Sequence, residues 1–139
     1  QLTRPFEGIV DVLDALTEAG IKMTVASNKP QEQCQQILKG LGLDHYFCGI
    51  WGPEAAARPK PEPDVLHMVM ELYGATADRT IMVGDTRNDV AAGRAAGVTS
   101  VFVTWGYVDV ADIDPDLIDI VVDEPSGLLD FDVAELRSR

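Results

Sequence analysis

The sequence predicts an α/β fold, a Rossmann-like three-layer sandwich with a mostly parallel sheet. Two observations carry this prediction. Short apolar runs typical of strands recur along the chain, and most are separated by a stretch with helical character. Such alternation favours parallel pairing, because a parallel crossover needs a connection of about a dozen residues or more. The 139 residues, of which 46% are hydrophobic, suffice for one core, and we expect a single domain over residues 1–139.

The first half of the chain contains two predicted helices and two predicted strands. Gly20 is a natural end for an amphipathic first helix, while Asn28 as a cap and Pro30 in the first turn indicate where the second helix begins. The predicted elements are a helix over 7–19, a strand over 21–27, a helix from Pro30 to about Leu41 and a strand over 46–52.

The second half begins with a proline-rich loop and then alternates again. The run TIMVG is the most strand-like segment of the chain, and the small residues of DVAAGRAAG suit a helix that lies close to a sheet. The predicted elements are a loop over 53–63, a helix over 64–73, a strand over 80–84, a helix over 89–97, strands over 100–105 and 118–123, and a closing helix over 127–139.

The composition excludes several classes of protein. A formal net charge of −12 repels phosphate backbones, so we expect no nucleic-acid partner. No apolar run is long enough to cross a membrane, and the N-terminus lacks the order of a signal peptide, so a cytoplasmic protein without a membrane partner is expected. Cys34 and Cys48 do not form a disulfide framework and are predicted to pack as small apolar residues.

Two acidic residues follow the most strand-like run. Asp85 ends the strand, and Asp89 lies in the first turn of the next helix. Ligands of parallel α/β folds bind beyond the carboxyl ends of the strands. Two carboxylates at that edge either cap the helix, with Asn88 or Asp89 as the cap, or hold Mg²⁺ together with a substrate phosphate.

The Mg²⁺ interpretation requires phosphate-binding groups at neighbouring strand ends. Ser27 and Asn28 follow the first strand and precede a helix N-terminus, where a hydroxyl, backbone N–H groups and the helix dipole favour an anion. Lys60 stands between Pro59 and Pro61, which stiffen the backbone around it. The alternatives are a simple helix cap for Ser27 and an ordinary surface loop for Lys60.

The segments VASNKP, RPKPEP and VGDTRNDVAAGRAAG, in this order and on these elements, resemble the haloacid dehalogenase superfamily, and most of all its phosphoglycolate phosphatase-like members. The resemblance covers essentially the whole chain. It implies an Mg²⁺-dependent phosphohydrolase that acts on a small phosphorylated metabolite through an aspartyl-phosphate intermediate.

The resemblance also implies roles for individual residues. Ser27 and the backbone of Asn28 would bind the phosphoryl group, and Lys60 would offset its charge. Asp85 would bind Mg²⁺, Asp89 would bind it directly or through water, and Asn88 would orient the two acids.

The first motif of that family, a strand ending in Asp-x-Asp, is not found near the N-terminus. The strings DID at 112–114 and DFD at 130–132 lack the strand before and the Gly-Thr turn after. We therefore expect a C-terminal part of the family's core, without the first strand and the cap. The strands at 21–27 and 80–84 would then either face each other across a gap or pair directly.

Two other functions stay open. One is a catalytically inactive binding or scaffolding module that keeps the fold. The other is a receiver-like signalling domain, which the order of the motifs disfavours because the acidic pair follows the lysine instead of preceding it.

Overall fold

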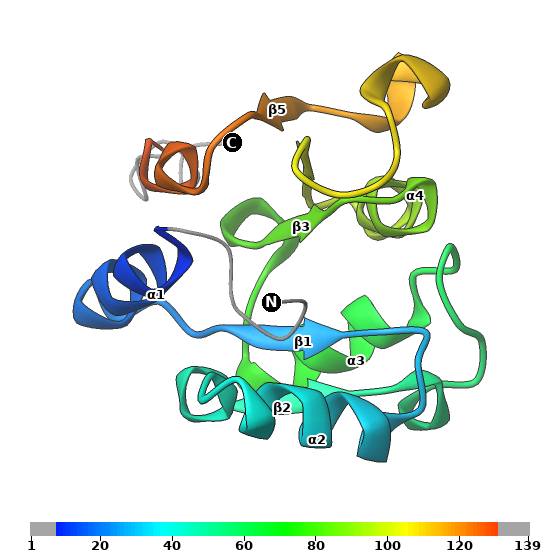
Figure 1. The fold of residues 1–139 in the computed structure, drawn as a ribbon. Coiled ribbons are helices and arrows are strands. Elements are labelled where there is room, and N and C mark those ends of the chain that lie inside the picture. Colours follow the sequence, from blue (N-terminus) through cyan, green and yellow to red (C-terminus); the bar gives the residue numbers. More distant parts are fainter. Residues whose placement is uncertain (1–7, 131–139) are drawn as a thin grey trace.

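The computed structural model describes residues 8–130, which form an α/β structure of parallel strands and covering helices (Figure 1). The predicted fold class is confirmed. The α-helices are α1 (Ile9–Glu18), α2 (Gln31–Gly40), α3 (Asp64–Tyr73) and α4 (Arg87–Ala96), and the strands are β1 (Thr24–Ala26), β2 (Gly49–Trp51), β3 (Ile81–Gly84), β4 (Thr99–Val103) and β5 (Ile120–Val122).

Within the described part of the chain, the strands form two separate parallel sheets. In the first, β1 pairs with β2, and in the second the order is β3-β4-β5. The predicted continuous sheet is therefore interrupted between β1 and β3. The expectation that these two strands could pair directly is wrong. The other alternative, in which they face each other across a gap, describes the arrangement of residues 8–130.

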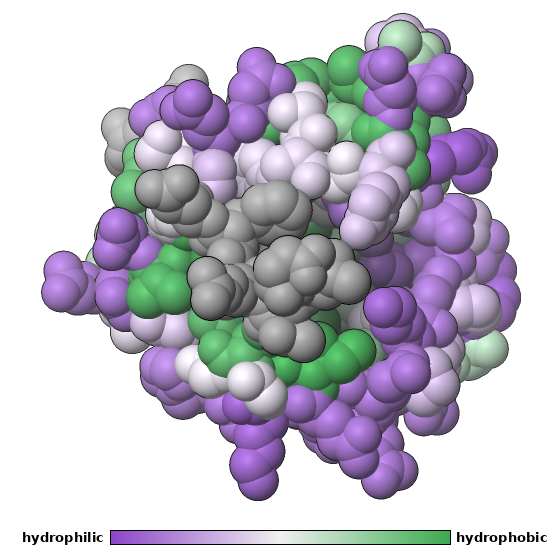
Figure 2. All heavy atoms as spheres, in the orientation of Figure 1, coloured by the Kyte–Doolittle hydropathy of each residue, from purple (hydrophilic) through white to green (hydrophobic). Residues whose placement is uncertain are grey.

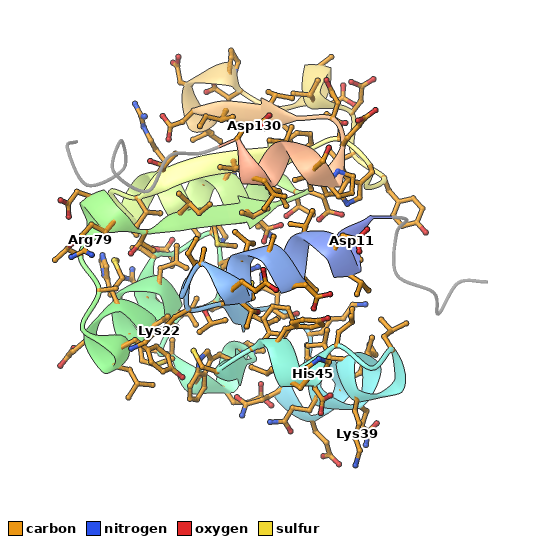
Figure 3. All side chains as sticks on the ribbon, turned by 90° about the vertical axis from the view of Figure 1, so that its left-hand side faces the viewer. Asp11, Lys22, Lys39, His45, Arg79 and Asp130 are labelled. Atoms are coloured by element: carbon orange, nitrogen blue, oxygen red, sulfur yellow. The ribbon has the colours of Figure 1, made fainter. Side chains whose placement is uncertain are left out.

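Helices and a shared core hold the two sheets together. A buried cluster of α3, α4 and β3 residues also receives Ala26 of β1 and Trp51 of β2, so one apolar core spans both sheets. Helix α1 adds a second connection between the half of the molecule that contains β3, β4 and β5 and the half that contains β1 and β2. It contacts the 3-10 helix η6 (Pro125–Leu129) of the first half and the 3-10 helix η1 (Asp44–Tyr46) of the second. Figure 3 shows α1 running between the two halves. Packing thus replaces the missing hydrogen bonds between β1 and β3.

Several element bounds differ from those predicted, mainly at the ends. Helix α4 begins two residues earlier than expected because Thr86 caps it, its Oγ1 accepting a hydrogen bond from the Asp89 backbone N–H. Helix α2 begins after Pro30, and Asn28 does not cap it. The strands are shorter than predicted. The first three residues of the closing helix expected over 127–139 belong instead to η6, while 131–139 lie outside the described residues.

The surface is largely hydrophilic on the face drawn in Figure 2. Figure 2 shows hydrophilic residues over most of the rim of one face, with hydrophobic residues gathered nearer its middle. In residues 8–130 no helix has the length and apolar character needed to cross a membrane. Cys34 is buried as predicted, but Cys48 is exposed, so its prediction as a packed apolar residue is wrong.

Helix α4 lies unusually close to the strands it covers. A Cβ atom on Gly93 would collide with Ser100 Oγ and come within 3.0 Å of Met82 Cβ. The Ser100 hydroxyl is fully buried and donates a hydrogen bond to the Val90 carbonyl at 2.8 Å. The glycine is what allows a serine of β4 to bond to the helix backbone. This close approach places the first turn of α4 beside the end of β3.

Gly93→Ala should lower the free energy of unfolding by about 1–2 kcal/mol, because overpacking outweighs the gain in helix propensity. Gly40→Ala is the matched control. A Cβ at Gly40 meets nothing within 4 Å, so that variant should be neutral or up to about 1 kcal/mol more stable. Urea denaturation of both variants measures the difference, and equal stability of the two would contradict the packing argument.

Candidate active site

Lys60 is a buried lysine that joins the two sheets. Its side chain is almost fully covered, with the residue 8% exposed. Nζ donates a hydrogen bond to the Ala26 carbonyl at 2.7 Å and forms an ion pair with Asp89 Oδ1. A buried ammonium is costly unless it is paired and hydrogen-bonded, and here both conditions are met. The lysine therefore connects the end of β1 with the first turn of α4.

Asp89 is the other half of this pair and is also 8% exposed. Oδ1 faces Lys60, and Oδ2 accepts a hydrogen bond from Thr86 Oγ1 at 2.9 Å. Its carboxylate lies in the first turn of α4, where the helix dipole favours negative charge. The space that it occupies exists because residue 84 is glycine, since a Cβ there would collide with the Asp89 side chain. The helix-cap alternative is thus wrong for both Asn88 and Asp89, because Thr86 supplies the cap.

Asn28 contacts Lys60 through its side chain. Nδ2 donates to the Lys60 carbonyl at 2.9 Å, and Oδ1 accepts from the Lys60 backbone N–H at 3.1 Å. The sequence motif had indicated a phosphate contact through the Asn28 backbone. The structure adds a side-chain contact that sequence reasoning missed, since nothing in the spacing of 28 and 60 signals it.

Ser27 directly follows β1 and is half-buried. Its Oγ accepts a hydrogen bond from the Lys29 backbone N–H at 3.0 Å, which shapes the turn after the strand. An oxygen that accepts this bond still carries a proton to donate. Ser27 thus remains able to donate to an anion placed beyond the strand end.

The N-terminus of α2 already carries a carboxylate from the protein. The Gln31 backbone N–H points at both Glu54 oxygens, at 3.2 and 3.3 Å, and the Gln31 side chain accepts from the Gly52 N–H. Sequence reasoning missed Glu54, although an acid soon after a strand is a detectable signal. The backbone N–H groups of this helix end were expected to attract phosphate. The first of them, that of Gln31, is hydrogen-bonded to Glu54.

Asp85 is half-buried at the end of β3 and lies against Gly106. A Cβ on Gly106 would stand 2.6 Å from Asp85 Cβ and collide with Oδ2. Gly106 has no positive φ, so only this contact opposes a side chain there. The Asp85 carboxylate forms no hydrogen bond or ion pair with any residue between 8 and 130. Asn88, expected to orient the acids, is exposed on α4 and bonds to neither within the same residues.

These residues fit a sparsely ligated Mg²⁺ better than a protein-caged metal. No group of three or more His, Cys, Asp or Glu side chains with metal-binding geometry occurs among the described residues. Mg²⁺ commonly uses one or two carboxylates and completes its octahedron with waters and substrate phosphate oxygens. No residue of the described range 8–130 occupies the Asp85 oxygens, which suits this role, while Asp89 is held by Lys60 and Thr86.

The loop that carries Lys60 is tied to α3 as well. Arg58 donates two hydrogen bonds to the Asp64 carboxylate, at 2.8 and 3.1 Å. These bonds hold the pKa of Asp64 below its ordinary value. The Arg58 side chain is largely exposed, so the contribution of the pair to stability is small. Its effect is to fix the loop on the first residue of the helix.

Asp89→Ala should lower the free energy of unfolding by about 3–5 kcal/mol, because it leaves the Lys60 ammonium buried and unpaired. Adding Lys60→Met removes that orphan charge and should restore much of the loss. Asp85→Asn is the control, with an expected change within about 0.5 kcal/mol. Denaturation of the complete protein measures all three. A double variant less stable than Asp89→Ala would contradict the buried-pair interpretation.

If Asp85 is an Mg²⁺ ligand, Gly106→Ala should weaken Mg²⁺ binding, because a methyl group there displaces the Asp85 carboxylate. We expect a loss of about tenfold or more in affinity by calorimetric titration, in line with the effect of disturbing residues that orient a metal ligand. Tyr107→Ala is the neighbouring control, since Tyr107 is fully exposed. If Gly106→Ala binds Mg²⁺ like the wild-type protein, Asp85 is not the ligand.

Comparison with known proteins tests the resemblance seen in the motifs. Residues 1–103 match the family model of haloacid dehalogenase-like hydrolases. A phosphoglycolate phosphatase of Agrobacterium fabrum is 39% identical over 128 residues, which cover 91% of this chain and 54% of that protein. One from Pseudomonas putida is 34% identical over 93% of this chain and 47% of its own length.

The fold comparison agrees. The structure of a predicted phosphoglycolate phosphatase from Haemophilus somnus superposes with a TM-score of 0.79 at 30% identity, covering 89% of this chain and 56% of that one. The chain thus spans about half the length of the relatives that it matches. Sequence and fold agree in this comparison, and the chain belongs to the haloacid dehalogenase-like hydrolase family.

Proposed function

We propose that the complete protein is an Mg²⁺-dependent phosphatase. It hydrolyses a small phosphorylated metabolite, in the manner of a phosphoglycolate phosphatase, through an aspartyl-phosphate intermediate. The observation that carries this proposal is the buried Lys60, whose ammonium is held between the end of β1 and Asp89 of α4. A lysine paired with Asp89 and bonded to the residue before Ser27, at the carboxyl ends of parallel strands, suits a phosphoryl group better than any neutral ligand.

Each residue would act by position and charge. The Ser27 hydroxyl donates a hydrogen bond to a phosphoryl oxygen. The Lys60 ammonium lowers the electrostatic cost of bringing an anionic nucleophile towards an anionic phosphate. Asp85 would hold Mg²⁺, with Asp89 beside it. When bound, Mg²⁺ would neutralise charge on the phosphoryl oxygens. Asp89 also keeps Lys60 aimed into the site.

The nucleophile belongs to a segment other than residues 8–130. We propose that a strand carrying the attacking aspartate lies between β1 and β3, whose facing edges are unpaired in the described residues. The attacking carboxylate would form a bond to phosphorus as the bond from phosphorus to the substrate oxygen breaks and that oxygen takes a proton. Water would then release inorganic phosphate and restore the aspartate.

The relatives direct the choice of substrate to be tested. Those named above are phosphoglycolate phosphatases, so phosphoglycolate is the first natural candidate for this protein. A generic aryl phosphate serves as a second substrate because it tests the reaction without depending on selectivity.

The test uses the complete protein with p-nitrophenyl phosphate and phosphoglycolate. We expect Mg²⁺-dependent turnover that Asp85→Asn reduces by at least about a hundredfold, because the charge that holds the cation is removed. Mg²⁺ should also raise the melting temperature, and Asp85→Asn should remove most of that shift. Residues 1–139 alone should show no turnover, because they lack the nucleophile.

Three outcomes would contradict parts of this proposal. Turnover by residues 1–139 alone that Asp85→Asn abolishes would place the nucleophile within them. An Mg²⁺-independent melting temperature would remove the metal assignment. Folded complete protein with no turnover of any phosphate ester would favour an inactive binding module.

A further inference from the structure

The side-chain amide of Asn28 uses both of its polar atoms on the backbone of a single distant residue. One bond runs from Asn28 Nδ2 to the Lys60 carbonyl and the other from the Lys60 N–H to Asn28 Oδ1, at 2.9 and 3.1 Å. This pair of bonds, between residues 32 apart in the sequence, resembles the exchange between two strands. From it we infer that Asn28 is a positioning residue that sets where the Lys60 ammonium stands. The inference rests on the proposed function.

The prolines on either side of Lys60 limit the hydrogen bonds that can hold its backbone. Pro59 and Pro61 have no N–H group, so Lys60 carries the only backbone donor of this tripeptide. That donor and the Lys60 carbonyl both go to Asn28. The neighbouring Arg58 is tied to α3 instead, through Asp64. Without Asn28, the backbone of Lys60 would lose its link to the end of β1.

The same strand end also holds the other end of the lysine. Nζ bonds to the carbonyl of Ala26, two residues before Asn28. The backbone and the ammonium of Lys60 are therefore both hydrogen-bonded to the segment 26–28, which also contains Ser27. The distance between the ammonium and the Ser27 hydroxyl is thus set locally, although Lys60 lies on another loop. Errors of about 1 Å in such placement can cost a hundredfold in rate.

A competing role for Asn28 is direct contact with the substrate. A side-chain amide has two N–H donors, and only one of them is used on Lys60. The two roles differ in one respect that can be measured. A positioning residue acts only through Lys60, whereas a substrate contact acts independently of it.

A double-mutant cycle on the complete protein separates these roles. Asn28→Ala should lower kcat for p-nitrophenyl phosphate by about 10- to 100-fold, with KM changed by less than about threefold. In the Lys60→Met background, Asn28→Ala should lower kcat by less than about a further twofold, because the ammonium that Asn28 positions is already gone. Gln35→Ala, which removes an exposed amide from α2, is the control and should match the wild-type protein.

An equal loss in both backgrounds would overturn the inference and make Asn28 a substrate contact. If Lys60→Met does not fold, Lys60→Met combined with Asp89→Ala replaces it as the background, since no buried charge is then left unpaired.

A measurement without turnover distinguishes this inference from the proposed function. By NMR, the Lys60 backbone N–H should exchange with solvent at least about tenfold faster in Asn28→Ala, because it loses its acceptor. The Nζ–H₃⁺ signal of Lys60 should also shift, because a displaced backbone moves the ammonium relative to Ala26 and Asp89. If the wild-type protein hydrolyses no phosphate ester but these changes occur, the proposed function fails and the positioning of Lys60 by Asn28 stands. An unchanged Lys60 in Asn28→Ala rejects the inference whatever the activity.

Discussion

The buried ion pair between Lys60 and Asp89 is the contact on which the arrangement of this site depends. It joins a loop after β2 to the first turn of α4, and through the Ala26 carbonyl it reaches the end of β1. Because β1 and β3 are not hydrogen-bonded within residues 8–130, this contact crosses the break between the two sheets. Both charges are buried, so each requires the other, and removal of either leaves an uncompensated charge inside the protein.

Around this pair, small residues make room for the acids. Gly84 leaves space for Asp89, Gly106 for Asp85, and Gly93 lets α4 approach β4 closely enough for Ser100 to bond to its backbone. Each glycine serves a different neighbour, and none of the three has a positive φ. Their common effect is to bring charged groups and the helix end nearer to the strands than a side chain would allow. The position of the site therefore depends on the absence of Cβ atoms as much as on the acids.

Much of the fold was predictable because it follows from local patterns. The four α-helices of residues 8–130 were placed within a few residues, since apolar spacing and glycine stops are local properties. Strand ends were less accurate because a strand is defined by its partner, and β1 and β2 are limited to the residues that they pair. The helix-cap role of Thr86 was missed since Thr, Asn and Asp are all acceptable caps, and only the packing of Asp89 onto Lys60 decides among them.

By itself, the sequence determined the fold class, the family and the set of residues at the strand ends, because these depend on periodicity and on motifs that are contiguous in the chain. Only the tertiary structure decided how those residues are connected. It paired Asp89 with Lys60, gave Asp85 no partner among residues 8–130, placed Glu54 on the N-terminus of α2 and joined Asn28 to the backbone of Lys60. These contacts link residues 23 to 32 apart or close on glycines of other elements, and distance along the chain carries no information about them.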